Sequence, residues 1–89
     1  MTSRRRLVVS GRVQGVYYRA ACKAEADRLG LAGWARNLDD GQVEVVVEGD
    51  AIVVEQLARW CHDGPSRARV TAVTSTTEAP EGLTGFVAR

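Results

Sequence analysis

A β-hairpin in the middle of the chain constrains the fold more than any other feature of the sequence. Over residues 42–48 three valines occupy alternate positions, the period of two expected of a strand with one buried face. Residues 31–38 form another strand-like run. The Asp-Asp-Gly sequence at 39–41 separates the two and is typical of a tight turn, because glycine tolerates positive φ without steric cost. We therefore expect two adjacent antiparallel strands.

A segment of helical periodicity lies on each side of this hairpin. Over 19–29 apolar side chains recur at spacings of four and three, and Gly30 supplies the left-handed residue that commonly ends a helix. After the hairpin, Asp50 is suited to cap a second helix and Gly64-Pro65 to stop it. The apolar stripe of this second helix consists of Val53, Leu57, Trp60 and Cys61.

Three further strands complete the predicted order. Residues 7–10 are a short apolar run closed by a glycine, 69–76 are rich in β-branched residues, and 86–88 form a short strand near the C-terminus. The order strand, helix, strand, strand, helix, strand predicts an α+β, ferredoxin-like βαββαβ sandwich. We expect an antiparallel sheet with two helices on one face, a short extra C-terminal strand, and a single domain over residues 1–89.

Composition excludes several classes of protein. Among 89 residues, 45% are hydrophobic and 26% charged, which is ordinary for a globular chain and argues against disorder. A net charge of +1 disfavours a nucleic-acid partner. No stretch is apolar enough for a signal peptide or a membrane span, so we expect a cytoplasmic protein without a membrane partner. We also expect a monomer, although the sequence does not fix the oligomeric state. The run Arg4-Arg5-Arg6 is either a small basic arm or, as we favour, a consequence of general arginine usage.

The two cysteines carry no recognisable motif. Cys22 and Cys61 lie far apart, without CxxC or Cys/His metal spacing. We expect both to be reduced and partly buried, as is usual inside cells, although the sequence leaves a disulfide possible.

The segment GRVQGVYYR, residues 11–19, is the candidate functional loop. A strand–helix–strand crossover makes the first two strands parallel, so their C-terminal ends lie at one end of the sheet. The loop that follows the first strand is therefore expected beside residues 34–37, at the N-terminus of the first helix. A helix N-terminus offers unpaired N–H groups and partial positive charge, which suit an anion.

Arg19 strengthens the interpretation as an anion site. A cation at a helix N-terminus is mildly unfavourable for the helix, which favours a functional role for Arg19. Its guanidinium can bind phosphate oxygens in a bidentate manner. Gly15 lets the loop approach a ligand closely. Tyr17 and Tyr18 could instead stack on nucleic-acid bases, but they lie outside a strand and lack the signature of an RNA-binding sheet, so one is expected in the core and one over the loop.

Other notable side chains have ordinary interpretations. Trp34 and Trp60 are expected to pack, the former beside the site. The Asp39-Asp40 pair could suggest magnesium, but turn chemistry is the better explanation. His62 falls in the last turn of a helix, where a cation is mildly stabilising.

Two motifs together resemble those of the acylphosphatases. GRVQGVYYR is similar to the family's G-x-V-Q-G-V-aromatic-x-R loop, and GLAGWARNLDDG, residues 30–41, is similar to its second signature, G-W-x-x-N followed by D-G. Gly64-Pro65 and Phe86 also fit, and the resemblance covers nearly the whole chain. The Tyr17-Tyr18 pair and Ala88 depart from the common residue types, and neither departure is expected to touch the chemistry.

The resemblance implies an enzyme that hydrolyses acyl phosphates to a carboxylate and inorganic phosphate without a metal or other cofactor. Arg19 would bind the phosphoryl group and Asn37 would orient the attacking water, with a substrate oxygen accepting its proton. The backbone cradle for the phosphoryl group would be formed by Gln14, Gly15, Val16, Tyr17 and Tyr18, together with Arg19.

Two other functions are weighed against this one. A non-catalytic anion- or nucleotide-sensing module would need the loop and Arg19 but not Asn37, because a water-orienting side chain matters only for hydrolysis. An RNA-binding domain is disfavoured by the low net charge and the missing aromatic signature.

Overall fold

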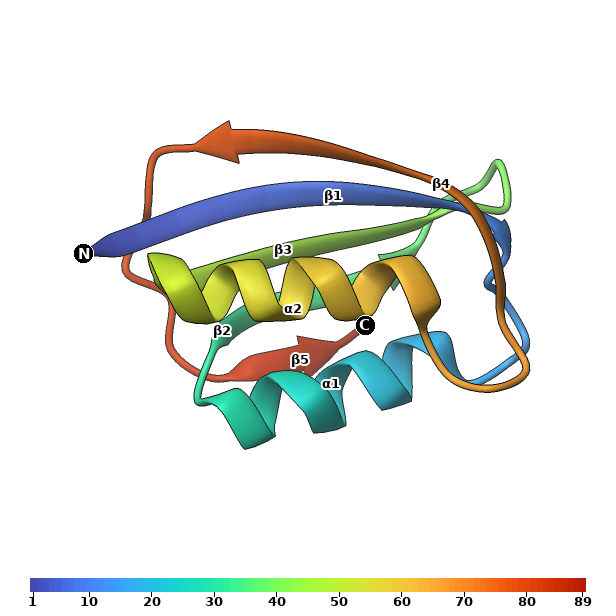
Figure 1. Cartoon of the computed structure of the whole chain (residues 1–89), viewed down its shortest axis with the longest axis horizontal. Helices are drawn as coiled ribbons and strands as arrows, with labels where there is room; N and C mark the ends of the chain where they lie inside the picture. The colour runs from blue at the N-terminus through green and yellow to red at the C-terminus, as the bar shows by residue number, and fades with distance from the viewer.

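The computed structural model describes residues 1–89, and its elements follow the predicted order (Figure 1). No helix is long and apolar enough to span a lipid bilayer. In chain order the elements are β1 (Thr2–Arg12), α1 (Tyr18–Leu29), β2 (Ala32–Asn37), β3 (Val43–Asp50), α2 (Ala51–Asp63), β4 (Arg69–Glu78) and β5 (Phe86–Ala88).

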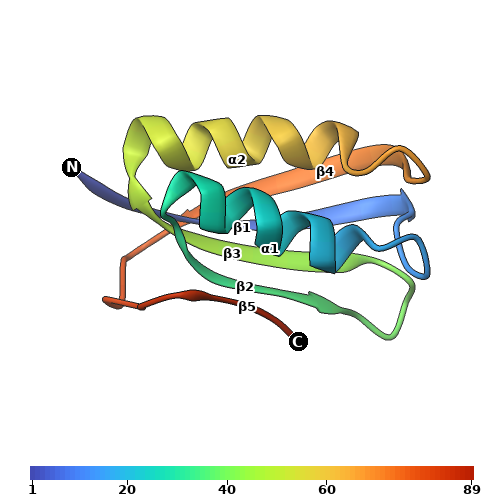
Figure 2. The same ribbon diagram turned by 90° about the horizontal axis from the view of Figure 1, so that it is seen from below.

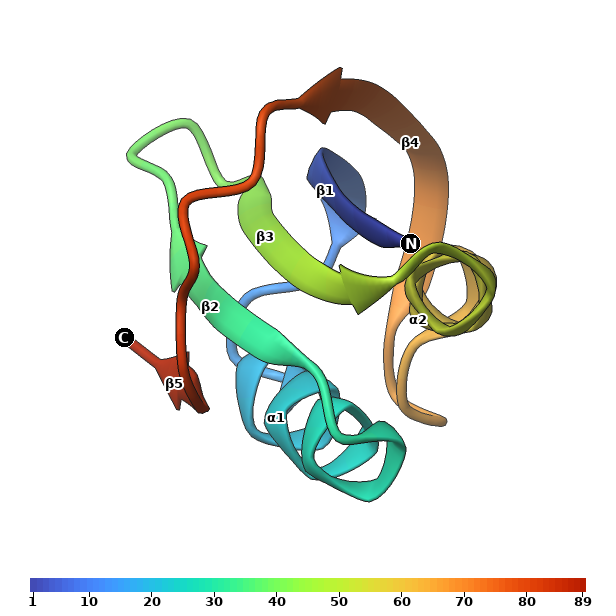
Figure 3. The same cartoon turned by 90° about the vertical axis from the view of Figure 1, so that its left-hand side faces the viewer.

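The five strands form one sheet in the order β4-β1-β3-β2-β5. β1 and β2 both run antiparallel to β3, so they are parallel to each other, as the crossover rule predicts. β5 pairs with β2 in the parallel direction, which makes the sheet mixed rather than wholly antiparallel as predicted. Both helices cover the same face of the sheet (Figure 3). The ferredoxin-like βαββαβ architecture is therefore confirmed.

Local signals define the ends of the helices as expected. Gly30 adopts φ 71° after α1, and its N–H donates to main-chain oxygens of the last turn. The Asp50 side chain accepts a hydrogen bond from the Ile52 N–H, so it caps α2. In the hairpin turn, Gly41 adopts φ 92° and the Gln42 N–H donates to the Asp40 carboxylate at 3.0 Å. The acidic pair thus serves turn geometry.

β1 is longer than the predicted strand 7–10. It begins at Thr2, so the run Arg4-Arg5-Arg6 lies within a strand that is paired with β3 on one side and β4 on the other. Arg4 is buried and forms ion pairs with Glu48 and Glu78. The run is consequently a structural part of the sheet and not a basic arm.

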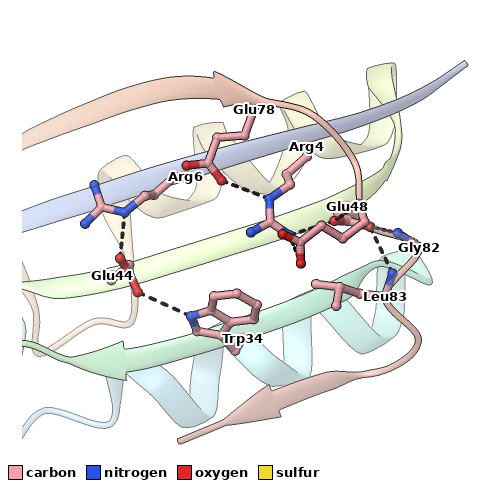
Figure 4. Close-up of polar contacts among 9 residues, drawn as sticks. Arg4, Arg6, Trp34, Glu44, Glu48, Glu78, Gly82 and Leu83 are labelled. Atoms are coloured by element: carbon pink, nitrogen blue, oxygen red, sulfur yellow. Dashed lines mark hydrogen bonds and ion pairs between the residues drawn. The ribbon is translucent and has the colours of Figure 1, made fainter.

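β3 is buried on both faces, which corrects the prediction of a half-buried strand. Its alternate valines pack in the core beneath the helices, as the period of two indicates. On the opposite face, Glu44 and Glu48 are covered by arginines from β1, by Trp34, and by the segment that connects β4 to β5 (Figure 4). The central place of β3 in the sheet explains this second cover.

The core lies between the helices and the sheet. α2 contributes Val54, Leu57, Ala58 and Cys61, so its buried stripe is rotated from the predicted one: Val53 and Trp60 are only partly buried. Cys22 of α1 is also fully buried, and both thiols are free.

Candidate active site

Three connections gather at one end of the molecule: the loop after β1, the β2–β3 turn and the segment after α2 (Figure 2). The Gln14 side chain fastens the first to the second, since its Nε2 donates to the main-chain oxygens of Leu38 at 2.8 Å and Gln42 at 2.9 Å. The loop turns into α1 through two left-handed residues, Gly15 at φ 74° and Tyr17 at φ 64°. The juxtaposition predicted from the crossover is therefore present.

The N-terminus of α1 is open at this end. Tyr17 makes no side-chain capping bond, and no acidic residue occupies the first turn. The Ala21 N–H donates to the Tyr17 main-chain oxygen at 3.0 Å, so the amides of residues 18–20 precede the first intrahelical bond. Unpaired amides at a positively polarised helix end are suited to an anion.

An open pocket of about 510 Å³ lies against this helix end. It brings Arg19 and Asn37 together, although they belong to α1 and β2 and lie eighteen positions apart in the chain. The lining includes two arginines and no carboxylate, which favours a negatively charged ligand. The residues that line it are Val13, Gly15, Tyr17, Tyr18, Arg19, Ala20, Asn37, Arg67 and Ala88.

The Arg19 side chain is oriented by Arg89, which follows β5. Its Nη1 donates to the main-chain oxygen of Arg89. Arg89 is itself held by its N–H bond to the Ala35 oxygen at 2.8 Å and by its guanidinium, which lies 4.4 Å from the centre of the Trp34 ring. Because a guanidinium has five N–H donors, Arg19 retains four for a ligand.

Tyr18 has a packing role despite lining the pocket. Its side chain is only 1% exposed, and its hydroxyl donates to the Cys61 main-chain oxygen at 2.7 Å. Its ring packs against Trp60 with the centroids 5.4 Å apart. Burial raises the pKa of Tyr18 far above its usual value. The buried phenol therefore stays protonated and keeps its hydrogen bond to the Cys61 oxygen.

The predicted site residues fall into two groups. Gly15, Tyr17, Tyr18, Arg19 and Asn37 line the pocket, whereas the Gln14 side chain points to the hairpin and Val16 is buried in the core. As expected of the tyrosine pair, Tyr18 is in the core, while Tyr17 is 74% exposed.

Four lining residues were missed: Val13, Ala20, Arg67 and Ala88. Tyr17 and Ala88, which depart from the common residue types of the family, both border the pocket, and their distance from the chemistry stays a prediction. Trp34, expected beside the site, does not line it and instead donates to Glu44 on the other face of the sheet. No group of three or more His, Cys, Asp or Glu side chains is arranged to hold a metal ion.

Known proteins resemble this chain in sequence and in fold. The sequence profile of the family described as Acylphosphatase matches residues 5–88. An acylphosphatase of Rubrobacter xylanophilus is 53% identical over 89 residues, which cover 99% of this chain and 81% of that protein. An acylphosphatase of Haloarcula marismortui is 52% identical over 87 residues, which cover 98% of this chain and 96% of that protein. The crystal structure of acylphosphatase from Bacillus subtilis superposes with a TM-score of 0.94 at 36% identity, covering 100% of this chain and 99% of that one.

Proposed function

Because this chain belongs to the acylphosphatase family, we propose that it carries out acyl phosphate hydrolysis at the pocket where Arg19 and Asn37 meet. The enzyme is an acylphosphatase, so its substrate is an acyl phosphate and one product is inorganic phosphate. The observation that carries the proposal is the convergence of an arginine, an amide side chain and an uncapped helix N-terminus on one pocket without carboxylates.

The phosphoryl group binds at the N-terminus of α1. Main-chain N–H groups of the loop from Gln14 to Tyr18 and the Arg19 guanidinium hold its oxygens, with Gly15 leaving room for close approach. In this scheme the donors stabilise the oxygens on which charge is carried during phosphoryl transfer, and their attachment to a loop and a helix end limits the reorganisation needed when substrate binds.

Asn37 directs a water molecule at phosphorus, in line with the bond to the acyl oxygen. The bond between phosphorus and the water oxygen forms as the bond to the carboxylate oxygen breaks, and the carboxylate leaves with the electron pair. A carboxylic acid has a pKa on the order of 4–5, so its anion leaves without a strong general acid. A substrate oxygen accepts the proton of the water, and no metal ion takes part in this scheme.

Two substitutions test these roles with benzoyl phosphate as substrate and a chelator in the buffer. Arg19→Ala is expected to lower kcat/KM by about 10²–10³ and to weaken competitive inhibition by inorganic phosphate, because it removes the charged donor. Asn37→Ala is expected to lower kcat by a similar factor of about 10², with phosphate inhibition largely unchanged, because only the water loses its partner.

Arg28→Ala is the matched control for charge. Arg28 lies in the last turn of α1 and pairs with Glu25, away from the pocket. The Arg28→Ala enzyme should have a kcat and an inhibition constant for phosphate close to the wild-type values. An active Asn37→Ala enzyme would contradict the assignment of Asn37, and hydrolysis that required added magnesium would contradict the whole scheme. A monomeric state, to be measured by size-exclusion chromatography, and a cytoplasmic location remain predictions.

A further inference from the structure

Arg67 is a second cation in the pocket, supplied by a different part of the chain from Arg19. It lies in the connection between α2 and β4, whose backbone is held at both ends. The Gly64 N–H donates to the Trp60 oxygen at 2.8 Å, and the Ala68 N–H donates to the Pro65 oxygen at 2.9 Å. Ala68 is part of the buried core. Arg67 is therefore presented to the pocket from a fixed turn.

Arg67 has no carboxylate partner in the protein. The nine ion pairs of the structure use the N-terminal amine, Lys23 and five arginines, and Arg67 is in none of them. Two further arginines lie near Arg67 in the chain or in the sheet. Arg69 is directly opposite Arg12 in the β1–β4 ladder, and like charges in this arrangement are unfavourable. Like Arg67, neither Arg12 nor Arg69 takes part in any of the nine ion pairs.

The proposed hydrolysis leaves Arg67 without a task, because Arg19 and the helix amides already face the phosphoryl group. Building on that proposed function, we propose that Arg67 recognises the acyl half of the substrate by binding a second anionic group on it. The preferred substrates are then acyl phosphates whose acyl chain ends in a carboxylate or phosphate. A neutral acyl group would leave the guanidinium in water.

The test compares two substrates that differ in this group. Succinyl phosphate carries a free carboxylate on its acyl chain, and benzoyl phosphate carries none. For Arg67→Gln we expect kcat/KM for succinyl phosphate to fall about fivefold, the upper range for an exposed ion pair. The value for benzoyl phosphate and the inhibition constant of inorganic phosphate should change less than about twofold.

Arg69→Gln is the matched control. It removes the same charge two residues further along the chain, and the Arg69 side chain does not line the pocket. An equal loss with both substrates would overturn the proposal and assign Arg67 to the phosphoryl group. No loss with either substrate would overturn it as well. A selective loss of the same size in Arg69→Gln would overturn it by showing that overall charge is sufficient.

A binding measurement separates this proposal from the proposed function. Calorimetry with two β-ketophosphonates, in which a methylene replaces the scissile oxygen, needs no turnover: one has a phenyl ketone and the other a chain ending in a carboxylate. If the wild-type protein hydrolysed neither substrate, the proposed function would fail. If Arg67→Gln lost affinity only for the carboxylated phosphonate, the role of Arg67 would still be supported. If Arg67→Gln and wild type bound the carboxylated phosphonate with equal affinity, that role would be overturned.

Discussion

At the scale of single residues, Tyr17 holds the one left-handed backbone conformation that does not belong to a glycine. A side chain in this conformation costs about 1–2 kcal/mol, because Cβ crowds the following carbonyl. Tyr17 is 74% exposed, so packing offsets little of this cost. Strained residues of this kind often occur at functional sites. Here the strain lies at the turn into α1 and at the wall of the pocket.

Replacing Tyr17 with glycine should stabilise the fold. Relief of the left-handed conformation is worth about 1–2 kcal/mol, while the freedom of glycine in the unfolded chain offsets about 0.5–1 kcal/mol. We expect the free energy of unfolding in urea to rise by about 0.5–1 kcal/mol.

Gly15→Ala is the converse control, since nothing lies within 4 Å of a Cβ there and only the left-handed backbone opposes it. It should lose about 1 kcal/mol. A Tyr17→Gly protein less stable than wild type would show that the ring contributes more than its conformation costs.

At the scale of elements, Glu48 of β3 fastens the segment that connects β4 to β5 (Figure 4). Its Oε2 accepts from Arg4 Nη1 at 2.7 Å and from the Glu81 N–H at 2.8 Å. Its Oε1 accepts from the N–H groups of Gly82 at 3.1 Å and Leu83 at 3.0 Å. β5 follows this segment and brings Ala88 to the pocket and the Arg89 oxygen to Arg19. One buried carboxylate thus connects the sheet to the proposed site.

Glu48→Gln should loosen this connection. The amide nitrogen cannot accept the main-chain N–H bonds, and the buried guanidinium of Arg4 loses its nearest charge partner, which together cost about 2–3 kcal/mol. We expect this loss in the free energy of unfolding, and faster hydrogen exchange in β5.

Glu81→Gln is the matched comparison for this change. Its carboxylate lies 3.7 Å from Arg4 and is 64% exposed, so the loss should stay below about 1 kcal/mol. Equal stability of the Glu48→Gln and wild-type proteins would contradict the role given to Glu48.

At the scale of the whole molecule, the two faces of the sheet have opposite chemistry. The helix-covered face encloses the apolar core. On the other face, buried carboxylates of β3 pair with arginines, Glu44 with Arg6 and Arg36, and Glu48 with Arg4. Burial alone would raise the pKa of both carboxyl groups. The hydrogen bonds from these arginines, joined by main-chain amides at Glu48, outweigh burial and lower the pKa, to about 2 for Glu48.

This arrangement predicts a loss of stability in acid. The unfolded chain has the ordinary carboxyl pKa of 4.5, so Glu48 contributes fully above that pH, and its contribution is lost as the pH falls from 4.5 toward 2. Glu48 contributes on the order of 3 kcal/mol to the free energy of unfolding at neutral pH. The lowered pKa of Glu44 makes that residue's contribution fall with acid as well.

Urea unfolding at pH 6, 4 and 3 should show a steep decline in wild type and a shallower one in Glu48→Gln. Parallel curves for the two proteins would contradict the assignment.

The amino-acid sequence by itself determined the elements and the end of the molecule where the candidate site lies. Helix periodicity, the Asp50 cap, the Gly30 stop and the Asp-Asp-Gly turn depend on residues within a few positions of each other, so they can be recognised in the chain. The handedness and direction of the crossover then placed Arg19 near Asn37.

Only the tertiary structure decided what distant residues do to one another. Arg4 meets Glu48 and Glu78 across 44 and 74 positions, which made a basic run part of the sheet and buried the second face of β3. Arg67 and Ala88 likewise reach the pocket from later segments of the chain. Periods of 2 and 3.6 describe which face a side chain occupies but not what covers that face. The cover depends on strand order and on the path of the connections, and these are settled when the whole chain packs.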